Sequence, residues 1–279
     1  MELKFTKMHG CGNDYIYFNC FETEIENPNR LSVILSDRHK SIGGDGIVLI
    51  CPSSVADAKM RMFNIDGSEG KMCGNAIRCV GKYLFEKGIA PKRDLNIETL
   101  SGIKHLELSL NGGEVERVRV DMGKAELLPE NIPVKLGGKS VISEKVSIAG
   151  SEYEITAVSM GNPHCVVFTE NVEALNLPEI GPLFENSPLF PERVNTEFVR
   201  VENANTLTMR VWERGSGETW ACGTGACAAA VAACENGFCN KGENITVKLL
   251  GGDLTVNYTS ESVFMAGNAV ISFEGSVRI

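Results

Sequence analysis

Two cysteines followed by glycine, Cys73 and Cys222, stand at the start of segments predicted to be helical. The segment Ala226–Cys234 is apolar on every side, which predicts a helix that is buried all round. A cysteine at a helix start faces unpaired backbone N–H groups and the positive end of the helix dipole. Both effects are expected to favour the thiolate and to lower the thiol pKa from about 8.5. The two residues are therefore candidate acid–base groups.

An internal repeat relates the two cysteines. The gapless shift of 149 residues that carries Cys73 onto Cys222 also aligns many other identical residues over about 90 positions. These pairs are Gly12-Asn13 with Gly161-Asn162, Met60-Arg61 with Met209-Arg210, Glu69 with Glu218, Glu86 with Glu235, Gly88 with Gly237, Leu100 with Leu249 and Gly102 with Gly251. Two copies predict a pseudo-twofold pair of domains.

The pattern of each half predicts mostly strands with one central helix. The first central helix is expected over Asn75–Lys87, closed by Gly88, and a short helix over Asn29–Ser36. The proline-rich stretch from Pro178 to Pro191 is read as a connection, and the join between halves as the charged stretch 120–150. Short strands between glycine turns predict an α/β (α+β) fold. It has two pseudo-symmetric domains, each a curved, mainly antiparallel sheet or barrel around its helix.

Composition excludes several classes of protein. The chain has 279 residues, 43% of them hydrophobic and 23% charged, with a formal net charge of −9. A net negative chain is not a general nucleic-acid binder. No apolar run approaches the roughly 20 residues that a membrane helix needs, and the N-terminus lacks the apolar stretch of a secretory signal. We therefore expect a cytoplasmic protein with no nucleic-acid or membrane partner.

Most of the ten cysteines are expected to be small apolar packing residues. No pair has C-x-x-C spacing, so neither a zinc site nor a redox dithiol is indicated, and we expect no bound metal. Gly215-Ser-Gly217 lacks the third glycine of a dinucleotide loop, and there is no Walker lysine. No cofactor is expected.

Two acid–base groups on opposite faces of one carbon can remove a proton from one side and return a proton to the other, which inverts a stereocentre. Two neighbouring thiols favour one thiolate and one thiol, because a second thiolate would be repelled. The helix starts at Gly74-Asn75 and Gly223-Thr224 could stabilise the negative charge that develops on a substrate. Two alternatives remain open: a redox or binding protein with a switchable Cys73–Cys222 disulfide, and a duplicated scaffold without activity.

Beyond these arguments, the sequence resembles the diaminopimelate epimerase family over its full length. The matching motifs are Lys7–Tyr15, Arg38-His39 with Gly43–Gly46, Phe63–Glu69, Cys73–Cys79, Gly161–His164, Asn195–Glu197, and Glu213–Gly215 through Cys222–Gly225. The resemblance implies a cofactor-independent isomerase that interconverts LL- and meso-2,6-diaminoheptanedioate, a small amino-acid substrate, for lysine and peptidoglycan synthesis. It also implies a homodimer, with one domain of residues 1–120 plus 269–279 and another of 121–268.

Residue roles carried over from the family fall into two groups. Cys73 and Cys222 would be the acid and base, with His164 and Glu213 tuning the thiols. The substrate-binding positions would be Asn13, Asn64, Gly74, Asn75, Asn162, Asn195, Glu213, Arg214, Gly223 and Thr224. Some members carry glutamine where this chain has Gly46, so a side-chain contact there is not expected.

Simpler readings exist for several of these residues. Arg214 could be a surface arginine, Glu213 a cap and His164 a turn residue after Asn-Pro. The asparagines could be turn residues, and Arg78 is expected to be solvated. The nearest functional rival is a proline or hydroxyproline racemase of the same architecture, which would not need the asparagine set and Arg214.

Overall fold

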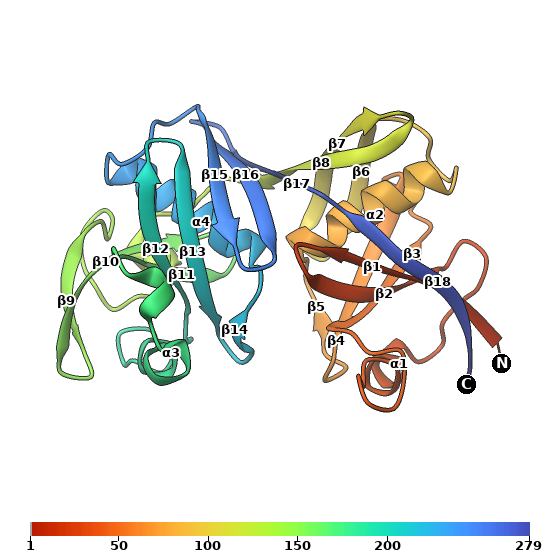
Figure 1. Ribbon diagram of the computed structural model, residues 1–279, viewed down its shortest axis with the longest axis horizontal. Helices are drawn as coiled ribbons and strands as arrows, with labels where there is room; N and C mark the ends of the chain where they lie inside the picture. The colour runs from red at the N-terminus through yellow and green to blue at the C-terminus, as the bar shows by residue number, and fades with distance from the viewer. Residues whose placement is uncertain (1) are drawn as a thin grey trace. The chain divides into compact units, whose positions relative to one another are not determined.

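The computed structural model describes residues 2–279, which fold mainly as strands around four α-helices (Figure 1). The chain divides into two compact units. Unit 1 holds the residues up to Asp121 together with Ala266–Ile279, and unit 2 holds Met122–Met265.

Unit 1 is one mixed sheet with a helix on each face. Its helices are α1 (Pro28–Leu35) and α2 (Gly74–Glu86). Its strands are β1 (Glu2–Gly10), β2 (Asn13–Asn19), β3 (Gly46–Cys51), β4 (Ala58–Asn64), β5 (Glu69–Gly70), β6 (Asp94–Thr99), β7 (Gly102–Asn111), β8 (Glu114–Gly123) and β18 (Val270–Arg278). The spatial order is β18-β1-β2-β3-β4-β6-β7-β8, with β2–β3 and β4–β6 parallel and the other pairs antiparallel.

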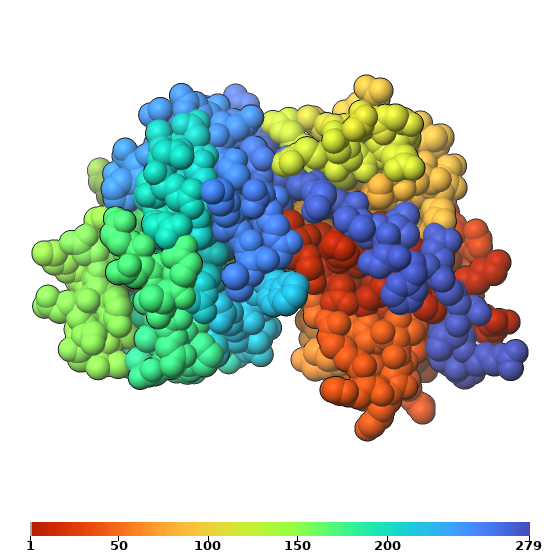
Figure 2. Space-filling view, viewed as in Figure 1, coloured from red at the N-terminus to blue at the C-terminus, as the bar shows by residue number. Residues whose placement is uncertain are grey.

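Alternation along β2 assigns the two faces of this sheet. Ile16 and Phe18 belong to the core that also contains Leu31 and Leu35 of α1. The Tyr17 side chain points to the other face, where its hydroxyl donates to the carbonyl of Ala76 in α2. Strand β18 pairs with β1 and is mostly exposed, and Figure 2 shows it in blue on the surface of unit 1.

Unit 2 repeats the arrangement around α4. Its helices are α3 (Leu177–Glu185), α4 (Gly223–Glu235) and two short 3-10 turns, η1 (Pro129–Asn131) and η2 (Val172–Ala174). Its strands are β9 (Glu144–Ile148), β10 (Ser151–Ser159), β11 (Pro163–Phe168), β12 (Asn195–Asn203), β13 (Thr206–Glu213), β14 (Gly217–Thr219), β15 (Asn244–Leu249), β16 (Gly252–Tyr258) and β17 (Val263–Gly267). Nearly every α4 residue from Gly223 to Ala233 is buried, which confirms the predicted all-round burial.

The predicted duplication is confirmed element by element. A shift of 149 carries both ends of α2 onto α4 and both ends of β1 onto β10. It also carries the ion pair between Arg61 and Glu69 (2.7 Å) onto that between Arg210 and Glu218 (2.8 Å).

The gapless alignment of Leu100 with Leu249 and Gly102 with Gly251 is wrong by one residue. Strand β7 starts at Gly102 and β16 at Gly252, so the offset there is 150. The connection after α4 holds one residue more than that after α2. Gly102 and Gly252 both have positive φ at the equivalent turn, which is why glycine occurs at each position.

Several elements were not predicted, among them α3, β9 and β17. The proline-rich connection contains α3, in which Pro178 lies in the first turn, where its missing N–H would be unpaired anyway, and Pro182 lies inside the helix. The same shift of 149 places α3 on α1. Strand β9 forms a hairpin with β10 inside the predicted join, and β17 follows β16.

Candidate functional site

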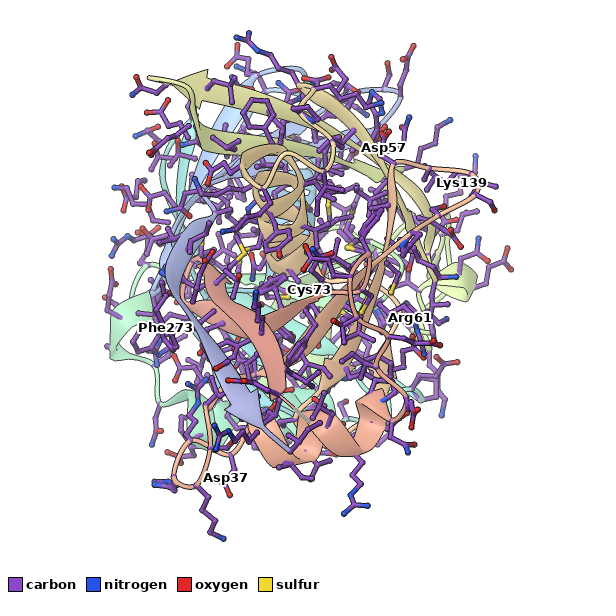
Figure 3. The ribbon with its side chains drawn as sticks, turned by 90° about the vertical axis from the view of Figure 1, so that its right-hand side faces the viewer. Asp37, Asp57, Arg61, Cys73, Lys139 and Phe273 are labelled. Carbon is purple, nitrogen blue, oxygen red and sulfur yellow. The ribbon has the colours of Figure 1, made fainter. Side chains whose placement is uncertain are left out.

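Each cysteine of the repeated pair is the residue that precedes the first turn of a buried helix. Cys73 precedes α2 (Figure 3) and Cys222 precedes α4, both with extended backbone. The predicted placement of the two thiols at helix starts is therefore confirmed. The surroundings of the two thiols differ.

The Cys73 thiol is partly buried and lies beside an amide. Its Sγ donates to Oδ1 of Asn13 at 3.4 Å. The amide nitrogen of Asn13 in turn donates to Oδ2 of Asp45 at 2.7 Å. Because Asp45 accepts from the nitrogen, the oxygen of Asn13 is the atom turned toward the thiol.

A network of charges holds this arrangement from behind. Asp45 also accepts from the backbone N–H of Asp14 and pairs with Arg38 at 2.9 Å. Asp14 pairs with Arg38 and with the nearly buried Lys7, each at 2.6 Å. Burial acts to raise the pKa of Asp14, but hydrogen bonds from Arg38 and Lys7 outweigh it, and the pKa lies below its ordinary value. These charged residues position Asn13.

The Cys222 thiol is buried, with 6% of the residue exposed. Its Sγ accepts from the backbone N–H of Gly225 at 3.3 Å and lies 3.5 Å from the hydroxyl of Thr224. Burial raises its pKa well above the ordinary value, and the carboxyls of Glu213 and Glu197 raise it further. The hydrogen bonds at the helix start act in the expected direction but are outweighed. The expectation that the helix start lowers the pKa of Cys222 is therefore wrong.

Glu213 closes strand β13 beside this thiol. Burial raises the pKa of its carboxyl, while hydrogen bonds from Thr219 and Cys222 act in the opposite direction. A carboxyl with a perturbed pKa beside a thiol is a candidate acid–base group. Its equivalent in unit 1 under the 149 shift is Asn64, whose amide donates to the Ser68 hydroxyl at 3.0 Å.

His164 is fully buried on β11 and joins two other side chains. Its Nδ1 lies 2.7 Å from Oε1 of the fully buried Glu197, and its Nε2 lies 3.1 Å from Oδ1 of Asn162. Parallel pairing of β11 with β12 brings these strands together, with His164 opposite Asn195. Glu197 lies in a motif of the family resemblance, but sequence reasoning assigned it no role.

The other predicted substrate-binding residues are held by backbone contacts or lie in the first turns of the two central helices. In unit 2, Oδ1 of the buried Asn195 accepts from the backbone N–H of Arg214 at 2.9 Å. The Arg214 guanidinium donates to the carbonyl of Glu192 at 2.9 Å. Gly74, Asn75 and Gly223 are buried in the first turns of α2 and α4.

Two other residues of unit 1 clarify the sequence reading. A Cβ on Gly46 would lie 2.0 Å from the carbonyl oxygen of Phe63, so no side chain fits there. Arg78 was expected to be solvated, and this is wrong: it is fully buried in α2, where it donates to the carbonyls of Gly74 and Asn268.

Comparison with known proteins places this geometry in a family. The family model described as diaminopimelate epimerase matches residues 5–128 and 156–272. The chain belongs to the diaminopimelate epimerase family. Diaminopimelate epimerases from Acetivibrio thermocellus and Methanococcus maripaludis are 56% and 53% identical to it, each over 99% of this chain and 99% and 100% of the relative. The resemblance and the epimerase class predicted from the motifs are confirmed.

Solved structures with low sequence identity share the fold. A PhzF-family phenazine biosynthesis protein from Bacillus anthracis has a TM-score of 0.73 at 18% identity, over all of both chains. A hydroxyproline epimerase from Agrobacterium vitis has a TM-score of 0.69 at 14% identity, over 99% of this chain and 91% of its own. These likenesses confirm the α/β class.

Membrane-spanning helices are absent from residues 2–279, since none of the helices there combines sufficient length with sufficient apolar character.

Proposed function

We propose that this family member interconverts LL- and meso-2,6-diaminoheptanedioate by moving a proton between each of two thiols and one Cα, without a cofactor. The observation that carries the proposal is the recurrence of a cysteine at the start of the equivalent buried helix in both copies of a duplicated unit. A single nucleophilic cysteine would need no second copy, whereas inversion at one carbon needs one proton acceptor and one donor on opposite faces.

The proton balance of the reaction follows from the two thiols. One thiolate takes the Cα proton and becomes a thiol, while the other thiol donates its proton to the opposite face and becomes a thiolate. The raised pKa of Cys222 favours that residue as the initial donor, with Cys73 as the initial base. In the reverse direction the two residues exchange roles, and their titration belongs to the pair.

Backbone N–H groups at the two helix starts are proposed to bind the substrate carboxylate. Gly74, Asn75, Gly223 and Thr224 supply these groups, and the helix dipoles favour the charge that develops there. Glu213 and His164 are proposed to tune Cys222. The remaining substrate-binding side chains are proposed to be Asn13, Asn64, Asn162, Asn195 and Arg214.

Three further proposals concern context. The two compact units correspond to the two domains, with both thiols flanking one carbon in the substrate complex. The protein works in a reducing cytoplasm and supplies lysine and peptidoglycan synthesis. It forms a homodimer, which light scattering at micromolar concentration would test.

An exchange assay tests the activity. The purified chain is incubated in D₂O with LL-2,6-diaminoheptanedioate, and in parallel with L-proline and trans-4-hydroxy-L-proline. We expect the meso isomer to form with deuterium at one Cα, and no exchange in the two proline substrates. Exchange in proline or hydroxyproline alone would overturn the assignment in favour of the rival racemase.

A further inference from the structure

Three buried positions distinguish the two copies of the repeat. Under the 149 shift, His164, Glu197 and Gly225 of unit 2 take the places of Tyr15, Val48 and Ala76 of unit 1. All six residues are buried, so the change is in chemistry and not in exposure. One copy therefore carries an ionisable pair inside a scaffold that the other copy builds from apolar and aromatic residues.

The pair forms the middle of a chain of side chains. The Glu197 carboxylate faces Nδ1 of His164 at 2.7 Å, and Nε2 faces Oδ1 of Asn162 at 3.1 Å. Both ring nitrogens thus face oxygen atoms, so the ring is held from both sides. With its oxygen held by the ring, Asn162 keeps its amide N–H groups for a ligand.

Glu197 is costly for the fold to bury. Its residue exposure is 0%, and within residues 2–279 its Oε2 has no hydrogen-bond partner. A buried carboxylate oxygen without a partner destabilises a protein. A carboxylate beneath a helix start gains partial compensation from the dipole. Glu197 destabilises the fold and has no counterpart in unit 1, which indicates that it has a role in the site.

The start of α4 has a shape that accommodates the carboxylate. A Cβ on Gly225 would lie 2.6 Å from Oε1 of Glu197, closer than real contacts. At the equivalent place in α2 an alanine is present, and the residue equivalent to Glu197 is Val48. The glycine and the carboxylate therefore occur together in the same copy.

We propose that Glu197 is a positioning residue of the Cys222 half-site, which fixes the His164 ring and, through it, the Asn162 amide beside the start of α4. The inference rests on the proposed function, since it assigns Asn162 to substrate binding. The charge of Glu197 has a second consequence. It contributes to the raised pKa of Cys222, although burial and Glu213 contribute more. The groups that face this thiol are Glu213 from β13, Glu197 from β12, and Thr224 and the Gly225 N–H from α4. His164 from β11 acts on Glu213.

The test is the variant Glu197→Gln, which keeps the shape of the side chain and removes its charge. The matched control is Glu235→Gln, which neutralises a carboxyl at the opposite end of α4, where Glu235 accepts from Tyr258. The first readout is the nitrogen NMR spectrum of the His164 ring in histidine-labelled protein. We expect the ring nitrogen shifts of His164 to change in Glu197→Gln and to stay at their wild-type values in the control.

The second readout is the pH dependence of Cys222 alkylation by iodoacetamide, followed by peptide mass spectrometry in a Cys73→Ala background. Removing the charge of Glu197 favours the thiolate, so we expect the alkylation midpoint to move to lower pH. In the otherwise wild-type chain, kcat/KM should fall by about 10- to 100-fold, as when the partner that orients a functional histidine is removed.

Wild-type ring shifts and an unmoved alkylation midpoint in Glu197→Gln would overturn the proposal, even if the variant were less stable. Should Glu197→Gln fail to fold, Gly225→Ala pushes against the carboxylate without removing it. Wild-type ring shifts in that variant would equally contradict the proposal. Neither physical readout requires turnover, so a wild-type chain that lacks epimerase activity would defeat the proposed function alone.

Discussion

The two copies of the repeat share a backbone and differ in the charges around the cysteine. Beside Cys73 stand a neutral amide held by the partly exposed Asp45 and, within α2, the buried cation Arg78. Beside Cys222 stand two carboxyls, the partly buried Glu213 and the fully buried Glu197, and position 227, equivalent to Arg78, is a cysteine. Duplication thus supplies the symmetry of position, and divergence of the nearby charges gives the two proposed acid–base groups different electrostatic surroundings.

Removing either thiol should have the largest effect on the epimerisation rate. Cys73→Ala and Cys222→Ala should each lower the epimerisation rate by about 10³-fold or more, since each removes one of two acid–base groups. Cys234→Ala, late in α4, is the matched control and should keep wild-type turnover. Circular dichroism should show an unchanged fold. Normal turnover in either of the first two variants would be incompatible with two-thiol chemistry.

Neutralising Glu213 should have the next largest effect. Because this carboxyl raises the pKa of Cys222, Glu213→Gln lowers that pKa and increases the thiolate fraction at any given pH. Alkylation of Cys222 should therefore begin at lower pH, while kcat/KM falls by about 100-fold. If the alkylation midpoint stayed where it is in the wild type, the claimed electrostatic difference between the two thiols would lose its main support.

Removing the hydrogen-bond partner of Asn13, beside Cys73, should lower kcat/KM by a smaller factor. Asp45→Ala removes the carboxylate that accepts from the Asn13 amide, a charged hydrogen bond of about 1.5 kcal/mol. This corresponds to about tenfold in kcat/KM, expected mainly through KM. Asp37→Ala, whose carboxyl accepts from the backbone N–H of His39 in an exposed turn, is the control. Equal kinetic effects of both changes would show that Asp45 has no special role.

The duplicated ion pairs offer the smallest and most direct comparison. Arg210 is more buried than Arg61 and also donates to backbone carbonyls of residues 172, 173 and 175. Glu218→Gln should therefore cost about 1 kcal/mol of unfolding free energy, and Glu69→Gln about 0.5 kcal/mol. Urea denaturation measures both. A larger loss for Glu69→Gln would reverse the ranking by burial.

Much of the fold could be predicted because the repeat doubles each local signal. The shift of 149 located both central helices, and applied to α1 it would also have located α3, which the prolines concealed. The extra residue in the connection after α4 could not be seen from the sequence. Leucine and glycine are each doubled at Leu249-Leu250 and Gly251-Gly252, so Leu100 and Gly102 align with identical residues at an offset of 149 as well as 150.

The site was harder to predict because its electrostatics depend on burial. The placement of Cys73 and Cys222 followed from sequence, but the sign of the pKa shift at Cys222 did not. That sign comes mainly from burial and from Glu213. Glu197 adds to it; this residue lies 25 residues earlier in the chain and reaches the thiol only through the pairing of β12 within the sheet. Arg78 was misread for the same reason: a charged residue in a short helical segment does not reveal that every face of the helix is covered.

The most direct test of the central claim is the fate of the Cα hydrogen during the first turnovers in D₂O. Two thiols on opposite faces predict that newly formed meso product carries deuterium, while recovered LL substrate keeps its original hydrogen. Product that retained the substrate hydrogen, or substrate that gained deuterium as fast as product formed, would show that one group serves both faces and would contradict the account.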